Sequence, residues 1–155
     1  MVSKVIIENE FFDELVKVAR KSTCHRSKCG SIIVKDGKII GVGYNSQPCN
    51  IEGECFKDFL PSEFKSDKTC CIHAEQRAIF DALKRNGDML EGSILFFIRL
   101  DENDNPKRSG EPYCTICSKS ALDVGISKFA YGINLDGLHM KPNIIINYPL
   151  NYECG

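Results

Sequence analysis

The sequence predicts an α/β fold, a sandwich in which helices cover both faces of a mixed β-sheet. Three observations predict it. The expected elements follow the order helix, hairpin, helix, strand, helix, strand, strand, which gives layered α/β packing. The chain has 155 residues, of which 43% are apolar and 26% charged, so we expect one globular domain over residues 1–155. The link from Ile133 to Asn143 is too short for a parallel crossover, so the last two strands should be antiparallel.

The N-terminal part is predicted to form a helix and a hairpin. Apolar residues recur at helical spacing over residues 10–22. The segment CGSIIVKDGKIIGVGYN, residues 29–45, has the turn dipeptide Asp36-Gly37 between two apolar runs, which is a strong hairpin signal. Residues 45–70 show no clear period, and we expect a long loop with at most one short helical turn.

The remaining elements alternate between helix and strand. An amphipathic helix begins near His73 and is predicted to end at Arg85, before the capping pair Asn86-Gly87. The apolar run ILFFIRL, residues 94–100, suits a strand that is buried on both faces. The other expected elements are a polar, turn-rich loop at 101–111, a helix from Cys114 to Val124 closed by Gly125, and strands at 126–133 and 143–148.

Residues with metal chemistry fall at the starts of two predicted helices. His73 begins one helix, and Cys114 and Cys117 stand three residues apart at the start of another, so both sulfurs can point from one face. A helix N-terminus favours the thiolate that binds a metal. The two helix starts can meet at one edge of the sheet. One imidazole and two thiolates leave the fourth position of a zinc tetrahedron open for water, as in catalytic zinc sites.

Glu75 supplies a carboxylate beside these ligands. Zinc lowers the pKa of its bound water, and a nearby carboxylate that is not a ligand can pass the proton to a leaving group. The signature H-x-E followed by P-C-x-x-C is that of zinc deaminases. The simpler alternatives are a structural zinc knot or core thiols, with Glu75 as a partner of the helix dipole.

These motifs resemble the cytidine deaminase superfamily. STCHRSKCGSIIVKDGKIIGVGYNSQP followed by CIHAEQRAI is similar to the deoxycytidylate deaminases, and the resemblance covers roughly residues 11–133. It implies a three-layer cytidine-deaminase-like sandwich with a mixed five-stranded sheet, one catalytic zinc, oligomeric assembly and ammonia release. The residues it implies are His73, Cys114 and Cys117 for zinc, Glu75 for proton transfer, Asn45 for a sugar hydroxyl and Ala74 for a backbone contact to the base.

The sequence departs from the family pattern at three places. Tyr113 separates Pro112 from the first cysteine of the C-x-x-C motif. Arg77 stands where deoxycytidylate deaminases commonly have an Asn after the H-x-E motif. Residues 101–111 add a polar loop that should lie near the mouth of the site, where it could act as a lid or reshape substrate choice.

Deoxycytidylate is the first substrate to try, and another small aminated heterocycle is the near alternative. Arg26, Lys28 and Arg77 could meet a substrate phosphate, although surface charge is the commoner role. The formal net charge of -1 disfavours an RNA or DNA deaminase. A non-catalytic zinc-binding module is the alternative from another class.

The cysteine count bears on compartment and partners. Nine cysteines without a signal-peptide pattern or a membrane-length apolar run favour reduced thiols and a cytoplasmic protein. The family resemblance implies a homo-oligomer, a dimer or larger. Some of these cysteines could bind a second zinc, but the sequence contains no second C-x-x-C, so most are expected to be free buried thiols.

Overall fold

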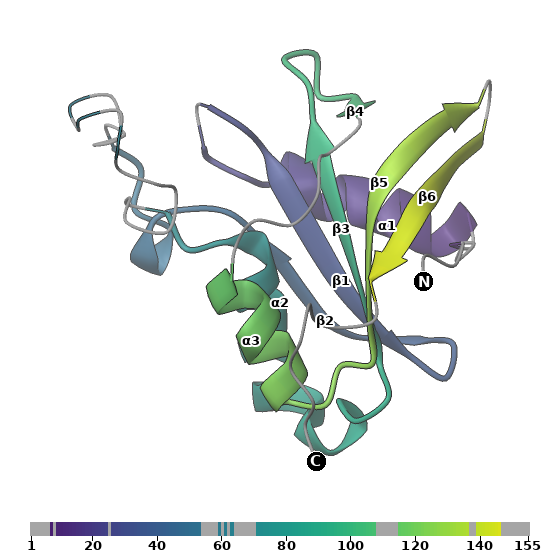
Figure 1. Cartoon of the computed structure of the whole chain (residues 1–155). Helices are drawn as coiled ribbons and strands as arrows, with labels where there is room; N and C mark the ends of the chain where they lie inside the picture. The colour runs from purple at the N-terminus through teal and green to yellow at the C-terminus, as the bar shows by residue number, and fades with distance from the viewer. Residues whose placement is uncertain are drawn as a thin grey trace.

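The structure is a computed structural model that describes residues 7, 9–24, 26–53, 59, 61, 63, 71–107, 115–136 and 139–146. Its helices and strands follow the predicted order (Figure 1). They are α1 (Asn9–Arg20), β1 (Cys29–Lys35), β2 (Lys38–Tyr44), α2 (Ala74–Asn86), β3 (Ile94–Leu100), β4 (Pro106–Lys107), α3 (Thr115–Asp123), β5 (Lys128–Asp136) and β6 (His139–Ile146). The predicted α/β class is confirmed.

The strands form one mixed sheet in the order β2-β1-β3-β5-β6, and the short β4 pairs with β3 outside this path. β1 is antiparallel to β2 and β3, whereas β3 and β5 are parallel. β5 and β6 are antiparallel, as the short link predicted. The predicted bounds of these two strands were wrong, because pairing continues to Asp136 and His139. The polar residues of this outer hairpin lack the apolar alternation by which strands are recognised.

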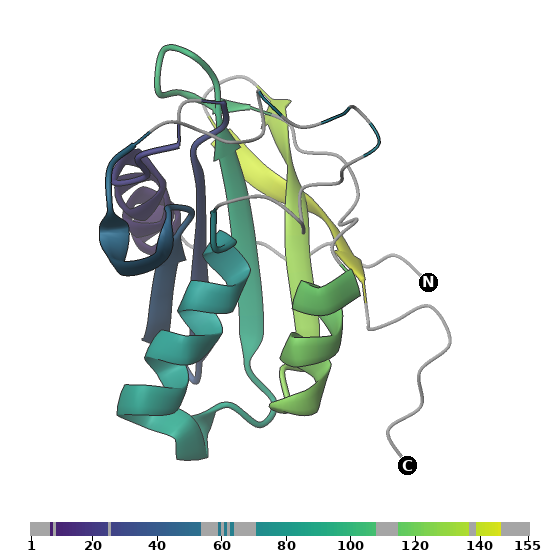
Figure 2. The ribbon, with the colours of Figure 1, turned by 90° about the vertical axis from the view of Figure 1, so that its left-hand side faces the viewer.

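Helices cover both faces of the sheet (Figures 1 and 2). α1 packs on one face, where the buried core includes Leu15, Val18, Ile32 and Ile98. α2 and α3 lie side by side on the other face, over a core that includes Ile33, Ile79, Leu95 and Phe129. Burial of each such side chain contributes about 1.5–3 kcal/mol, so the two cores fix the helices firmly on the sheet.

Two glycines bring α2 close to β2. A Cβ atom at Gly41 would lie 2.5 Å from Ala78 O and 2.7 Å from Ala82 Cβ. A Cβ atom at Gly43 would overlap the backbone of Ala74 and Ala78. The absence of side chains on this face of β2 therefore sets the depth at which the first turns of α2 rest on the sheet.

The turns are partly as predicted. Asp36 and Gly37 have φ of 49° and 75°, which suits the two-residue hairpin turn, and Gly125 with φ of 93° closes α3. α2 ends at Asn86 with Gly87 as its C-cap, as predicted, but Gly87 has a right-handed φ of −57° and not the left-handed conformation common at a glycine cap. The chain there continues into a 3-10 turn over Gly87–Met89, and the left-handed glycine follows at Gly92.

No helix within the described ranges combines the length and the apolar character needed to cross a membrane.

Candidate metal and substrate site

α2 and α3 lie side by side over one face of the sheet, and the first turns of both helices point toward the end of the sheet at which β3 ends (Figure 2). His73 is the residue before α2 and is held by backbone bonds on both sides. Ile72 and Ser46 exchange hydrogen bonds, with Ile72 N donating to Ser46 O at 2.8 Å and Ser46 N donating to Ile72 O at 3.3 Å. His73 N donates to Gln76 Oε1 at 3.2 Å, which satisfies an amide at the helix start. The imidazole is therefore placed by the end of the β2 segment and by the first turn of α2.

His73, Glu75 and Cys117 offer one ligand atom each, and these three atoms lie within 4.8 Å of one another. His73 Nδ1 is 3.3 Å from Cys117 Sγ. Tetrahedral zinc with ordinary Zn–N and Zn–S bonds separates such atoms by about 3.6 Å, so the pair fits a shared zinc ion. Cys114, the third predicted ligand, lies outside the described residues.

Glu75 and Cys117 are buried, with 8% and 1% of their surface exposed. Glu75 lies in the first turn of α2, where backbone N–H groups and the helix dipole favour a negative charge. A carboxylate that is both buried and next to a metal position can hold a proton at one stage of a reaction and release it at another. The arrangement suits proton transfer beside a Lewis acid.

Cys29 and Arg99 share the sheet face below this cluster. They are directly paired across β1 and β3, on the face that also carries Phe97. Burial raises the pKa of the Cys29 thiol, and bonds and charge from Ser27 and Arg99 oppose this effect. Among the described residues, Arg99 Nε is a buried donor without a hydrogen-bond partner. A polar group in this position is available to a bound water or ligand.

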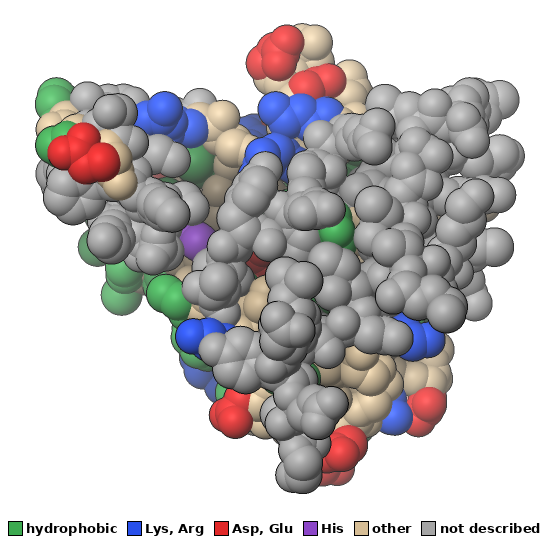
Figure 3. Space-filling view, viewed as in Figure 1, with side chains coloured by type: hydrophobic (Ala, Val, Ile, Leu, Met, Phe, Trp, Pro, Cys, Tyr) green, Lys and Arg blue, Asp and Glu red, His purple; other side chains and the backbone are tan. Residues whose placement is uncertain are grey.

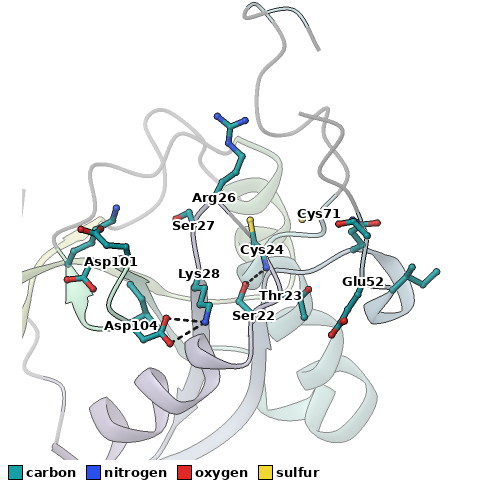
Figure 4. Close-up of a pocket in the computed structure, with 16 residues that line it drawn as sticks. Ser22, Thr23, Cys24, Arg26, Ser27, Lys28, Glu52, Cys71, Asp101 and Asp104 are labelled. Atoms are coloured by element: carbon teal, nitrogen blue, oxygen red, sulfur yellow. Dashed lines mark hydrogen bonds and ion pairs between the residues drawn. The ribbon is translucent and has the colours of Figure 1, made fainter. Parts of the chain in front are cut away.

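A pocket of about 630 Å³ opens at the same edge of the sheet. Its described lining comes from residues 22–28 before β1, 47–53 after β2, Cys71 before α2, and 100–107 after β3, and it does not include His73, Glu75 or Cys117. Cys71, which lines this pocket (Figure 4), stands two residues before His73 in the chain. Its walls carry Arg26, Lys28 and Lys107 together with four carboxylates.

Asn45 ties three segments of this edge together. Its Oδ1 accepts a hydrogen bond from Cys29 N at 2.8 Å and lies 2.5 Å from Ser22 Oγ. Its Nδ2 donates to Ser27 O at 2.7 Å. The side chain predicted to contact a sugar thus also fixes the entry of β1, and the bond to Ser27 O uses one of its two N–H groups.

The predicted cations occupy different positions. Arg77 Nη2 donates to Gln47 O at 2.8 Å, and its guanidinium lies 5.8 Å from the centre of the Tyr44 ring, so Arg77 joins α2 to the pocket wall. Arg26 and Lys28 line the pocket.

Sequence reasoning missed the position of Arg99 and the role of Asp104. It expected the loop at 101–111 near the mouth of the site, and the described residues Asp101, Glu102, Asp104 and Lys107 of this loop line the pocket. A charged residue within the apolar run ILFFIRL is a signal that could have identified Arg99.

Comparisons with known proteins agree with this geometry. The chain matches the family model described as the cytidine and deoxycytidylate deaminase zinc-binding region over residues 6–133. It is similar to the deoxycytidylate deaminase of Mycobacterium phage D29, with 32% identity over 122 residues, 73% of this chain and 84% of that protein. The deoxycytidylate deaminase of Saccharomyces cerevisiae is 26% identical over 129 residues, which cover 79% of this chain but 36% of the yeast protein.

A solved structure is also similar. The dCMP deaminase from the cyanophage S-TIM5, in complex with dCMP and dUMP, superposes with a TM-score of 0.52 and 27% sequence identity. The match covers 79% of this chain and 81% of that chain.

Proposed function

The chain belongs to the family of cytidine and deoxycytidylate deaminases that share this zinc-binding region, and from this premise we propose that it hydrolyses deoxycytidylate to deoxyuridylate and ammonia. The observation that carries the proposal is the convergence of His73, Glu75 and Cys117 within 4.8 Å at the starts of two helices. This donor set fits zinc. Cys114 is proposed as the third ligand from its place in the motif.

The reaction replaces an amino group by an oxygen. Zinc held by His73, Cys117 and Cys114 supplies a Lewis acid that lowers the pKa of a water molecule. Oxygen from water bonds to C4 of the pyrimidine, and the bond between C4 and the amino nitrogen breaks. The two protons of the water are delivered to the pyrimidine and to the departing nitrogen, so that uracil and ammonia balance cytosine and water.

Glu75 is proposed to move these protons. Its carboxylate takes a proton from the attacking water, gives it to N3 of the ring and later protonates the leaving nitrogen. Burial keeps bulk water away from the carboxylate, so the proton is passed to the substrate. General acid–base catalysis of this kind contributes about 10²–10⁴-fold to a rate.

The substrate contacts are proposals from position. The backbone of Ala74, next to His73 in the first turn of α2, would meet the base. Asn45 would use its second amide N–H for a sugar hydroxyl, while its other bonds hold β1 in place. Arg26, which lines the pocket, would lie on the phosphate side of the nucleotide.

Substitution of Glu75 tests the proposal. Glu75→Gln should fold and bind zinc as the wild type does, yet lose at least about 100-fold in kcat for ammonia release from deoxycytidylate. Glu10→Gln is the matched control, because Glu10 lies in the first turn of α1, on the other face of the sheet. Full activity of Glu75→Gln would refute the proton-transfer role. Zinc-loaded wild-type protein that releases no ammonia from any cytosine, adenine or guanine compound would favour a non-catalytic zinc-binding module.

We also propose that the protein is a homo-oligomer of the cytoplasm. The described cysteines Cys24, Cys29, Cys49, Cys71 and Cys117 form no disulfide, as is usual in reducing compartments. Phe80 and Leu83 on α2 are about half exposed and would be covered in an assembly of subunits. Light scattering after size-exclusion chromatography measures the subunit number, and a monomer at all concentrations would contradict the assembly.

A further inference from the structure

An ion pair lies at the edge of the pocket between the segment before β1 and the turn after β3. Lys28 Nζ is 3.0 Å from Asp104 Oδ1 and 3.3 Å from Asp104 Oδ2 (Figure 4). Both residues line the pocket. The two side chains keep 33% and 44% of their surface exposed, so the pair is accessible to a ligand that enters from solvent.

The turn that carries Asp104 is built by its own hydrogen bonds. Asp101 Oδ1 accepts bonds from Asn103 N at 2.8 Å and from Asn105 N at 3.0 Å. Asp104 N donates to Asp101 O at 3.0 Å, and Asp104 has a left-handed φ of 60°, a conformation that Asp and Asn tolerate better than most residues. Arg20 Nε donates to Asp104 O at 3.3 Å. The backbone that carries the Asp104 carboxylate is therefore fixed by the hydrogen bonds of the turn and by Arg20, independently of Lys28.

Lys28 is also fixed at its backbone. Leu100 N donates to Lys28 O at 2.9 Å, which joins the segment before β1 to the end of β3. The ammonium group can turn about its side chain while the backbone stays fixed. Figure 4 shows Lys28 extended toward Asp104, whereas Arg26 extends away from that turn. Figure 3 shows Lys and Arg side chains gathered near the upper ends of β3 and β4, below acidic side chains of the turn.

We propose that Lys28 binds the phosphate of the nucleotide and that Asp104 competes with the phosphate for it, so that this pair sets the preference for nucleotide over nucleoside. The inference rests on the proposed function, because it needs a nucleotide in the pocket. An exposed ion pair is worth little, so a dianionic phosphate can take the lysine from a single carboxylate. The described walls hold three basic and four acidic side chains, and Lys28 adds a positive charge for the phosphate beside Arg26 only when it leaves Asp104.

Steady-state kinetics with deoxycytidylate and deoxycytidine test this competition. Asp104→Asn should raise kcat/KM for deoxycytidylate about twofold to fivefold, the effect that corresponds to an exposed ion pair, and act on KM more than on kcat. Lys28→Met should lower kcat/KM for deoxycytidylate about tenfold more than for deoxycytidine. In the Lys28→Met background, Asp104→Asn should give no gain in kcat/KM, because no ammonium group is left for which Asp104 and the phosphate could compete.

The hairpin between β1 and β2 supplies matched controls. Asp36→Asn makes the same change at another left-handed turn position, with φ of 49°, and Lys38→Met removes an exposed lysine. Neither residue lines the pocket in the described part of the chain. Both controls should keep the wild-type ratio of nucleotide to nucleoside activity.

The outcomes separate the two proposals. If deoxycytidylate is turned over but Asp104→Asn behaves as Asp36→Asn does, or gains equally in the Lys28→Met background, the competition is refuted and the proposed function stands. If zinc-loaded wild-type protein turns over neither compound, the proposed function fails and this inference fails with it.

Discussion

Substitution of Gly43 by alanine should displace the catalytic helix. A Cβ atom there would overlap backbone atoms of Ala74 and Ala78 and lie 2.7 Å from Arg77 Cβ. Ordinary contact begins near 3.4 Å, so the first turn of α2 must move by about 1 Å. Overpacking of this kind costs about 1–3 kcal/mol, and a displacement of 1 Å at reacting groups can cost about 100-fold in rate. Gly43→Ala should therefore lose both stability and kcat.

Two other glycines act as controls for this experiment. A Cβ atom at Gly30 would lie 2.7–2.8 Å from Ala19 of α1, so Gly30→Ala should lower stability from the opposite face of the sheet while kcat changes much less. Gly87 has open space around it and a helical φ, so Gly87→Ala should be neutral or slightly stabilising. Thermal unfolding, zinc content and kcat are measured for all three variants. A folded Gly43→Ala protein with wild-type kcat and zinc content would refute the reasoning.

Three further results are expected. Arg77→Met should raise KM about twofold to tenfold with a smaller change in kcat, because it removes the bond to Gln47 O and the contact with Tyr44; an unchanged KM would contradict this role. Removal of zinc with a chelator should abolish ammonia release and added zinc should restore it, whereas Cys117→Ser should bind less zinc by metal analysis. Burial raises the pKa of Cys29 above 9.0, so the unfolded chain loses a proton that the folded chain keeps, and the free energy of unfolding should fall as pH rises above about 9. Urea denaturation on either side of that pH measures this fall in the free energy of unfolding. The fall should be shallower for Cys29→Ala than for the wild type, and the difference should be at most about 1.4 kcal/mol per pH unit.

The sequence predicted the fold well where periodicity and turn chemistry agreed. The run ILFFIRL forms β3 with the predicted bounds, and Asp36-Gly37 forms the hairpin turn. It failed where the signal was polar. β5 continues to Asp136 and β6 begins already at His139, so both strands are longer at the turn than predicted. Pro106–Lys107 also pairs with β3. Backbone hydrogen bonding at the edge of a sheet needs no apolar alternation, so the sequence pattern did not indicate these residues as strands.

The candidate site divides in the same way. The sequence predicted that His73, Glu75 and Cys117 lie together, and these side chains converge in the structure. Each motif marks the start of a helix, which is a local feature, and the topology of such a sheet brings helix starts together. Whether Cys114 joins them stays a prediction, since it lies outside the described residues. Asp104 could not be matched with Lys28 from the sequence, because 76 residues separate them and their contact depends on how the turn after β3 folds.

Substrate choice should depend on the segments that adjoin the ends of β1, β2 and β3. Every described residue that lines the pocket comes from residues 22–28, 47–53, 71 or 100–107, and none comes from β5 or β6. The resemblance to deoxycytidylate deaminases is carried in part by residues 22–48, which hold Lys28 and Asn45. The additional turn at Asp101–Lys107 contacts that segment through the ion pair between Asp104 and Lys28. A substitution in this turn should therefore change the charge at the proposed phosphate position and leave the zinc ligands in place.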